Sequence, residues 1–108
     1  ELPYRILRLC GGDMGFAFAI TYDFEVFSAA QEKWLEVSSV SNFESFQSNR
    51  MKIRFKNQDN KTQLVHTLNG SSLALPRIVA ALLENNQTAG GIQLPKALHT
   101  WFGSERID

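Results

Sequence analysis

LVHTLNGSSLALPRIVAALLENN, residues 64–86, decides the fold because it predicts a strand, a polar turn and an amphipathic helix in direct succession. Residues 64–69 show the period-2 spacing of a β-strand. Residues 69–72, NGSS, supply flexibility and a candidate N-cap for the helix. The helix has one apolar stripe with the spacing of a single helix face, formed by Leu75, Ile78, Val79, Leu82 and Leu83.

Arg77 lies in the first turn of this predicted helix. The start of a helix has free backbone N–H groups and a partial positive charge, so a nearby arginine makes the place attractive to an anion. This is the first indication of chemistry in the sequence.

The flanking sequence predicts a sheet for the helix to pack on. Strands are expected over residues 2–10, 22–27, 33–40 and 51–56, the last with one face in water. NQDNKT, residues 57–62, predicts a turn, so residues 51–69 should form an antiparallel hairpin. We also expect a short helix or a buried loop over 14–20 and a short helix over 42–49. An extended piece is expected over 92–95, where Pro95 either stops it or starts a last turn, and Trp101 and Phe102 are expected to dock the tail. The predicted fold class is α+β, an antiparallel β-sheet flanked by helices.

The composition excludes several classes of function. The 108 residues suit one domain or a piece of one, and 44% hydrophobic with 20% charged residues predicts a folded core. Eleven basic and eleven acidic residues leave no net charge, which argues against a dedicated nucleic-acid-binding module. Cys10 is a lone cysteine, so no internal disulfide or zinc cluster is expected. Neither a membrane-spanning run nor a signal peptide is visible, and we expect a cytoplasmic domain. A first residue other than Met fits a processed chain or a piece of a longer one.

Four stretches together resemble the seryl-tRNA synthetase family: LPYRILRLCGGDMGF (2–16), YDFEVF (22–27), WLEVSSVSNFESFQSNRMKIR (34–54) and HTLNGSSLALPRIVAALLEN (66–85). The resemblance extends to about Lys96. It implies the C-terminal part of a class II aminoacyl-tRNA synthetase catalytic domain, with the third class motif in residues 1–108. The N-terminal tRNA-binding arm and motifs 1 and 2 would be absent, so this piece alone is expected to be inactive.

The resemblance also implies the reaction. The family activates L-serine with ATP and Mg²⁺ to seryl-adenylate and transfers the serine to tRNA(Ser), without a covalent enzyme intermediate. Its members are homodimers, and tRNA contacts would lie mostly outside this chain.

Particular residues match the family's site. Glu36, Val37, Ser38 and Ser39 match the ATP-binding segment, and Glu36 and Ser39 would be the oxygen ligands of Mg²⁺. Because they lie three residues apart, we expect a bulge or a strand end between them. Ser71 would contact the substrate serine, with Asn69 adjacent. Arg77 would be the catalytic arginine on the ATP tail, neutralising charge in the transition state.

The chain departs from the family pattern at a few positions. Ser72 and Pro76 stand where glycines are frequent, and Pro76 fits if it lies in the first turn of the helix. Val40 and Phe43 replace cysteines that are interpreted as structural.

Each site residue also has a structural interpretation: a solvated strand carboxylate for Glu36, a turn residue for Ser71, an exposed helix arginine for Arg77. The presence of all the matching family motifs together favours the functional interpretation of these three residues. His66 is interpreted as a packed core residue, and Glu25 as structural, with Arg5 or Arg8 as its partner. The alternating Lys52, Arg54 and Lys56 are interpreted as a solvated face. Two other functions stay open: an adenylating relative that charges a carrier protein, and a non-catalytic domain that keeps the fold.

Overall fold

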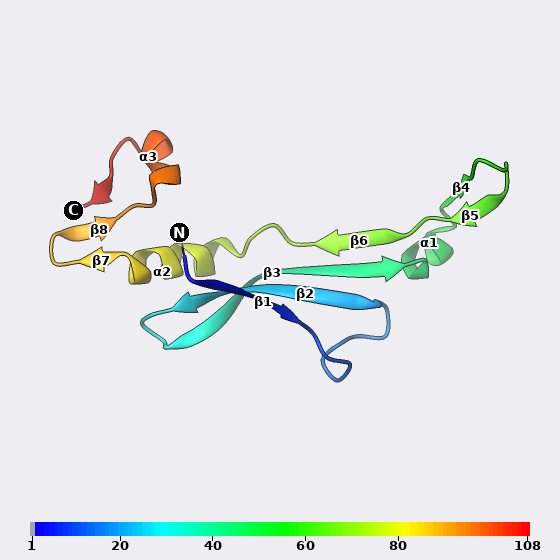
Figure 1. Cartoon of the computed structure of the whole chain (residues 1–108), viewed down its shortest axis with the longest axis horizontal. Helices are drawn as coiled ribbons and strands as arrows, with labels where there is room; N and C mark the ends of the chain where they lie inside the picture. Colours follow the sequence, from blue (N-terminus) through cyan, green and yellow to red (C-terminus); the bar gives the residue numbers. More distant parts are fainter. Residues whose placement is uncertain (1) are drawn as a thin grey trace. The chain divides into compact units, whose positions relative to one another are not determined.

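The computed structural model describes residues 2–108, which form two compact units. Unit 1 comprises the chain up to Arg5 together with Glu25–Val37 and Leu73–Asp108, and unit 2 comprises Ile6–Phe24 and Ser38–Ser72. The elements, shown in Figure 1, are β1 (Tyr4–Arg8), β2 (Ile20–Ser28), β3 (Lys33–Glu44), α1 (Phe46–Met51), β4 (Arg54–Lys56), β5 (Thr62–Leu64), β6 (Thr67–Gly70), α2 (Leu75–Asn85), β7 (Gln87–Thr88), β8 (Gly91–Gln93), α3 (Lys96–Phe102) and β9 (Arg106–Ile107).

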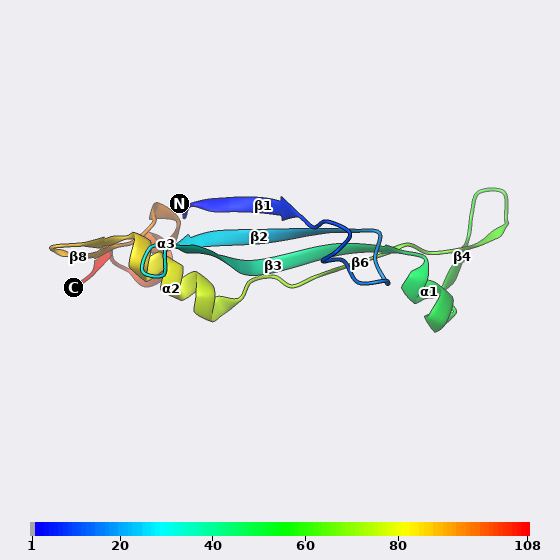
Figure 2. The same ribbon diagram turned by 90° about the horizontal axis from the view of Figure 1, so that it is seen from below.

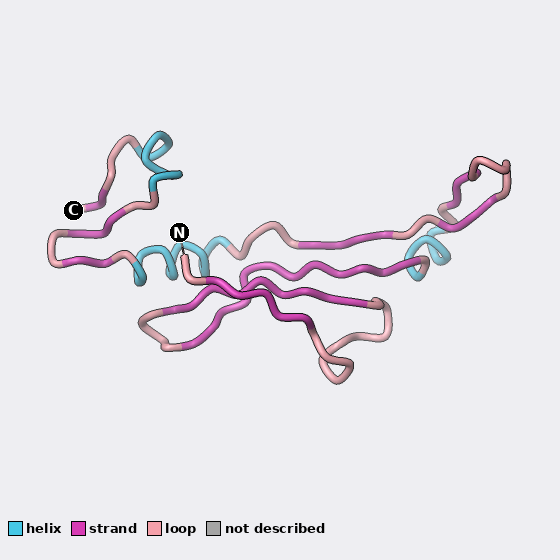
Figure 3. The backbone as a smooth tube through the Cα atoms, in the orientation of Figure 1, coloured by secondary structure: helices cyan, strands magenta, loops and turns pink. Residues whose placement is uncertain are grey.

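The strands form three sheets, with orders β1-β2-β3-β6, β4-β5 and β7-β8-β9. Strands predominate over helices along the chain (Figure 3), and β3–β6, β4–β5, β7–β8 and β8–β9 are antiparallel pairs. The predicted α+β class is therefore confirmed. Within residues 2–108, no helix is long and apolar enough to span a membrane.

In unit 2, β3 continues further than the sequence predicted. It pairs with β6 from Val40↔Gly70 to Glu44↔Thr67, with a register irregularity between Asn42 and Glu44. The short helix expected over residues 42–49 therefore begins only at Phe46. The predicted first residue of the helix was wrong. Residues 42–44 pair with β6, which is distant in sequence, and this pairing stabilises the strand more than the local spacing of the phenylalanines stabilises a helix.

The predicted hairpin is confirmed only in its centre. β4 pairs with β5 across a turn in which the Asn57 side chain accepts hydrogen bonds from the backbone N–H groups of Asp59 and Lys61, at 3.1 and 2.8 Å. The outer ends were wrong: Met51 belongs to α1, and the strand expected over 64–69 is divided between β5 and β6, which lie in different sheets. The chain leaves the ladder at Val65, whose carbonyl accepts a 2.6 Å bond from Ser48 Oγ. His66 is exposed here, so its predicted place in the core was also wrong.

The interior of unit 2 is partly polar. Thr21 Oγ1 and Ser41 Oγ lie 2.7 Å apart in a buried hydrogen bond, and the rings of Phe18 and Phe43 meet edge to face at 5.5 Å. The stretch 14–20 is a loop rather than a helix up to the start of β2, and Phe16 in it is 93% exposed. Both alternatives predicted for this stretch, a short helix and a buried loop, were therefore wrong.

In unit 1, α2 forms where the sequence predicted it, with Pro76 in its first turn and Asn86 as C-cap. Its N-cap is Ala74, which makes no side-chain cap, so the predicted cap from NGSS was wrong. The helix start is anchored instead by the Ala74 N–H, which donates to the Val37 carbonyl at 2.7 Å. The apolar stripe is only partly covered, because Leu75 and Val79 are 68% and 52% exposed.

Polar contacts tie α2 to the strands of unit 1. The buried Ser28 hydroxyl donates to Glu84 at 2.5 Å, and the Asn85 amide donates to the Phe27 carbonyl at 2.7 Å. The predicted ion pair of Glu25 is confirmed, with Arg5 as its partner.

After α2 the chain forms the small sheet β7-β8-β9 and the helix α3, seen edge-on in Figure 2. Of the two alternatives for Pro95, the start of a last turn is confirmed, because Pro95 is the N-cap of α3. The predicted docking by Trp101 and Phe102 was wrong, since these residues are 87% and 55% exposed.

The β7–β8 turn offers a stability test with a built-in control. Gly91 has φ +114°, and a Cβ there would collide with the Ile107 carbonyl oxygen, whereas a Cβ on Gly90 meets nothing within 4 Å. We expect Gly91→Ala to lower the free energy of unfolding by about 2 kcal/mol or more. Gly90→Ala should change it by less than about 0.5 kcal/mol. Urea unfolding of both variants measures the difference, and equal values would contradict the assigned backbone conformation.

Candidate functional site

Arg77 and Glu36 meet in unit 1. The Arg77 Nη1 donates to the backbone carbonyl of Glu36 at 2.5 Å, and the neighbouring Val37 carbonyl holds the start of α2. Both side chains are exposed, and neither forms an ion pair within residues 2–108. Because a guanidinium has five N–H donors, one carbonyl orients it and leaves the other donors open to an anion.

Ser71 meets Ser38 and Ser39 in unit 2. The Ser71 N–H donates to the Ser39 carbonyl at 3.2 Å, and the Ser39 N–H donates to Ser71 Oγ at 3.4 Å. The buried Ser38 hydroxyl donates to the Ser71 carbonyl at 2.5 Å. The side chain of Ser38 thus positions the backbone of Ser71, and the Ser71 hydroxyl is exposed at the end of β6.

Asn69 lies with different neighbours. It pairs with Ser41 across the β3–β6 ladder and lines a cavity of about 310 Å³ together with Gln47, Arg50 and Met51. The predicted neighbour of Ser71 therefore also belongs to a surface that α1 helps to form.

The predicted metal ligands have open oxygens. The Glu36 carboxylate and the Ser39 hydroxyl make no hydrogen bond with any described residue, so both can accept a cation. No cluster of three or more His, Cys, Asp or Glu side chains suited to a metal occurs within residues 2–108. Oxygen ligands of this kind are those that Mg²⁺ prefers. Glu36 belongs to unit 1 and Ser39 to unit 2. The strand end expected between Glu36 and Ser39 was wrong, because β3 runs on to Glu44, and the irregularity in its pairing with β6 lies at Asn42–Glu44.

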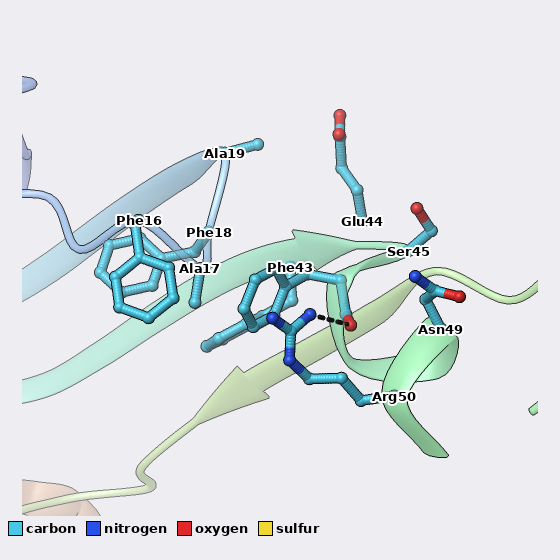
Figure 4. Close-up of a pocket in the computed structure, with 10 residues that line it drawn as sticks. Phe16, Ala17, Phe18, Ala19, Phe43, Glu44, Ser45, Asn49 and Arg50 are labelled. Carbon is cyan, nitrogen blue, oxygen red and sulfur yellow. Dashed lines mark hydrogen bonds between the residues drawn. The ribbon is translucent and has the colours of Figure 1, made fainter. Parts of the chain in front are cut away.

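A second cavity was not predicted. It measures about 400 Å³ and lies in unit 2 between the loop before β2, the end of β3 and α1 (Figure 4). The rings of Phe16 and Phe46 meet edge to face with centroids 5.7 Å apart, and the Arg50 guanidinium lies 3.6 Å from the Phe46 ring centroid. The signal in the sequence was the phenylalanine spacing around residues 43–46 and the arginine after it, but local spacing did not reveal that Phe16 joins them.

Comparison with known proteins defines the class. Residues 1–86 match the family model described as tRNA synthetase class II core domain (G, H, P, S and T), and the chain belongs to this family. The resemblance to seryl-tRNA synthetases is also confirmed. The chain is 64% identical over 109 residues to a serine–tRNA ligase of Salinibacter ruber, covering 99% of this chain and 26% of that protein. It is 50% identical over 109 residues to a serine–tRNA ligase of Finegoldia magna, covering 100% of this chain and 26% of that protein.

Solved structures of seryl-tRNA synthetases also resemble the chain. The seryl-tRNA synthetase of Pyrococcus horikoshii complexed with ATP aligns with a TM-score of 0.87 and 38% identity, over 100% of this chain and 25% of that one. The cytoplasmic serine–tRNA ligase of Naegleria fowleri in complex with AMP aligns with a TM-score of 0.83 and 26% identity, over 97% of this chain and 25% of that one. The chain spans about a quarter of the length of the relatives it matches.

Proposed function

We propose that this chain supplies part of the active site of a serine–tRNA ligase, which activates L-serine with ATP to seryl-adenylate and transfers the serine to tRNA(Ser). The observation that carries the proposal is Arg77, which the Glu36 carbonyl orients at the start of α2 with N–H donors left open. The position suits an anion such as a nucleotide phosphate, because both the guanidinium and the helix start favour negative charge. Similarity to serine–tRNA ligases supports the choice of serine and tRNA(Ser).

We assign the roles as follows. Arg77 neutralises charge on the phosphates while the serine carboxylate attacks the α-phosphorus, and the backbone and side chains of residues 36–39 bind ATP. Glu36 and Ser39 would hold Mg²⁺, whose chemistry when bound is charge neutralisation on the phosphate oxygens. Ser71 contacts the substrate serine through an exposed hydroxyl, and Asn69, two residues earlier in the chain, is the second serine-binding residue. We further propose that the full-length protein is a cytoplasmic homodimer.

The proposal is tested by serine-dependent ATP–pyrophosphate exchange and by aminoacylation of tRNA(Ser) with the full-length protein. We expect exchange with serine and at most a trace with alanine, together with charging of tRNA(Ser). The isolated 108-residue chain should give no measurable exchange, because it supplies only part of the site.

Two outcomes would contradict the proposal. Exchange without charging of tRNA(Ser), together with loading of a carrier protein, would favour the adenylating relative. Absence of exchange from the full-length protein with any amino acid would favour a non-catalytic domain.

A further inference from the structure

The cavity around Phe16 joins an unusually exposed aromatic ring to an oriented cation (Figure 4). The Phe16 side chain is 93% exposed, although it contacts Phe46 with an angle of 69° between the ring planes. An edge-to-face contact holds the ring and leaves a face of it open. An open aromatic face is a platform on which a planar ring, such as a nucleobase, can stack.

Arg50 is positioned by two contacts on the same neighbour. Its guanidinium covers the Phe46 ring at 3.6 Å, and its Nη1 donates to the Phe46 carbonyl at 3.3 Å. Arg50 makes no ion pair with any residue from 2 to 108. Its remaining donors are therefore available to a phosphate, which a guanidinium binds with charge-assisted hydrogen bonds.

The cations that follow in the chain extend this positive charge. Residues 50–56, RMKIRFK, carry four basic and no acidic side chains, although the whole chain has no net charge. Lys52, Arg54 and Lys56 are all exposed and belong to the same unit as the cavity. One acidic residue, Glu44, lines the cavity, and the polar Asn49 and Ser45 offer groups that can pair with a base edge. An open aromatic ring beside Arg50, followed in the chain by three more exposed basic residues, suits a single-stranded polyanion with bases rather than an apolar peptide.

We propose that this cavity binds one unpaired nucleotide of an RNA, with its base stacked on Phe16 and its phosphate beside Arg50, while residues 52–56 contact the following phosphates. An unpaired nucleotide is required because only an unstacked base can present its face to the ring. The inference rests on the proposed function, which supplies an RNA substrate, and it assigns part of the RNA contact to this chain.

The test uses the full-length protein and two fluorescently labelled probes, tRNA(Ser) and a single-stranded RNA of ten nucleotides, with binding followed by anisotropy. Phe16→Ala should weaken RNA binding by about tenfold, within the range of roughly 5- to 150-fold for loss of a stacking contact. Arg50→Ala should also weaken it by about tenfold, because a charge-assisted contact with a phosphate is lost. Phe16→Trp keeps an aromatic ring for stacking, so its RNA affinity should be close to that of the unsubstituted protein. Trp101→Ala is the matched control, because Trp101 is also highly exposed but lies in unit 1. The RNA affinity of this variant should equal that of the unsubstituted protein.

Two further readouts separate this inference from a structural role. Serine-dependent ATP–pyrophosphate exchange needs no RNA, so it should be unchanged in Phe16→Ala. Lys52→Ala and Arg54→Ala should each reduce the slope of log affinity against log salt concentration for the single-stranded probe by about 0.7.

Unchanged RNA affinity in Phe16→Ala and Arg50→Ala would overturn the inference. A lower melting temperature of Phe16→Ala with unchanged RNA affinity would also overturn it, since Phe16 would then have a structural role only. Exchange that is absent even in the unsubstituted protein would refute the proposed function instead, and RNA binding that still depends on Phe16 would leave the nucleotide site standing.

Discussion

Arg77→Ala in the full-length protein is expected to slow serine-dependent ATP–pyrophosphate exchange by about 10²- to 10³-fold, a loss of roughly 3 kcal/mol in transition-state stabilisation. The reason is local. The guanidinium is held by the Glu36 carbonyl at the start of α2, so it is aligned before the substrate arrives. Alanine removes both the charge and the donors. The rate is measured with saturating ATP and serine, so that weaker binding does not hide the effect on the reaction.

The controls for this experiment are two arginine substitutions. Arg77→Lys keeps the charge but loses the planar fork, and it should give an intermediate rate. Arg106→Ala removes another arginine of unit 1, one that pairs with Asp108 at 2.7 Å, and it should leave exchange unchanged. A normal rate in Arg77→Ala would remove Arg77 from the site, and an equal loss in Arg106→Ala would indicate general damage to unit 1.

Glu36→Gln should raise the Mg²⁺ concentration needed for half-maximal exchange by about tenfold or more. The amide keeps the shape of the side chain but replaces a carboxylate, which Mg²⁺ prefers, by a neutral oxygen. The substitution leaves the backbone carbonyl that orients Arg77 in place, so its effect is separable from the loss of the arginine. Calorimetric binding of ATP at several Mg²⁺ concentrations gives a second measurement that does not depend on turnover.

Ser39→Ala should shift the Mg²⁺ dependence in the same direction by a smaller factor, because a hydroxyl contributes no charge to the cation. Glu105→Gln, which changes another exposed glutamate of unit 1, serves as the control and should behave like the unsubstituted protein. A Mg²⁺ dependence that is identical in Glu36→Gln would exclude this carboxylate as a ligand.

Local sequence patterns predicted the elements whose partners are close in the chain. The β4–β5 turn forms because Asn57 caps it with its own side chain, and α2 forms where its apolar spacing and Pro76 indicate. The family resemblance located Arg77, Ser71 and residues 36–39, but it said nothing of what holds them in place.

Long-range pairing produced the elements that local patterns placed wrongly. Residues 64–69 have the spacing of one strand, yet β6 leaves the hairpin because its backbone pairs with β3. Because of the same pairing, α1 begins only at Phe46. In the candidate site, the contacts of Arg77 with the Glu36 carbonyl and of Ser38 with the Ser71 carbonyl join residues 41 and 33 positions apart. No periodicity within one segment can report such contacts.

The sequence by itself determined the α+β class, the position of α2 and the residue types present at the candidate site. Those properties depend on side-chain identity and on spacing within a few residues. Only the tertiary structure decided that a backbone carbonyl orients Arg77, that β6 joins β3, and that Phe16 meets Phe46 and Arg50 in one cavity. Those properties depend on which distant segments exchange hydrogen bonds and bury surface together, and that is settled by the free energy of the whole chain rather than by any stretch of it.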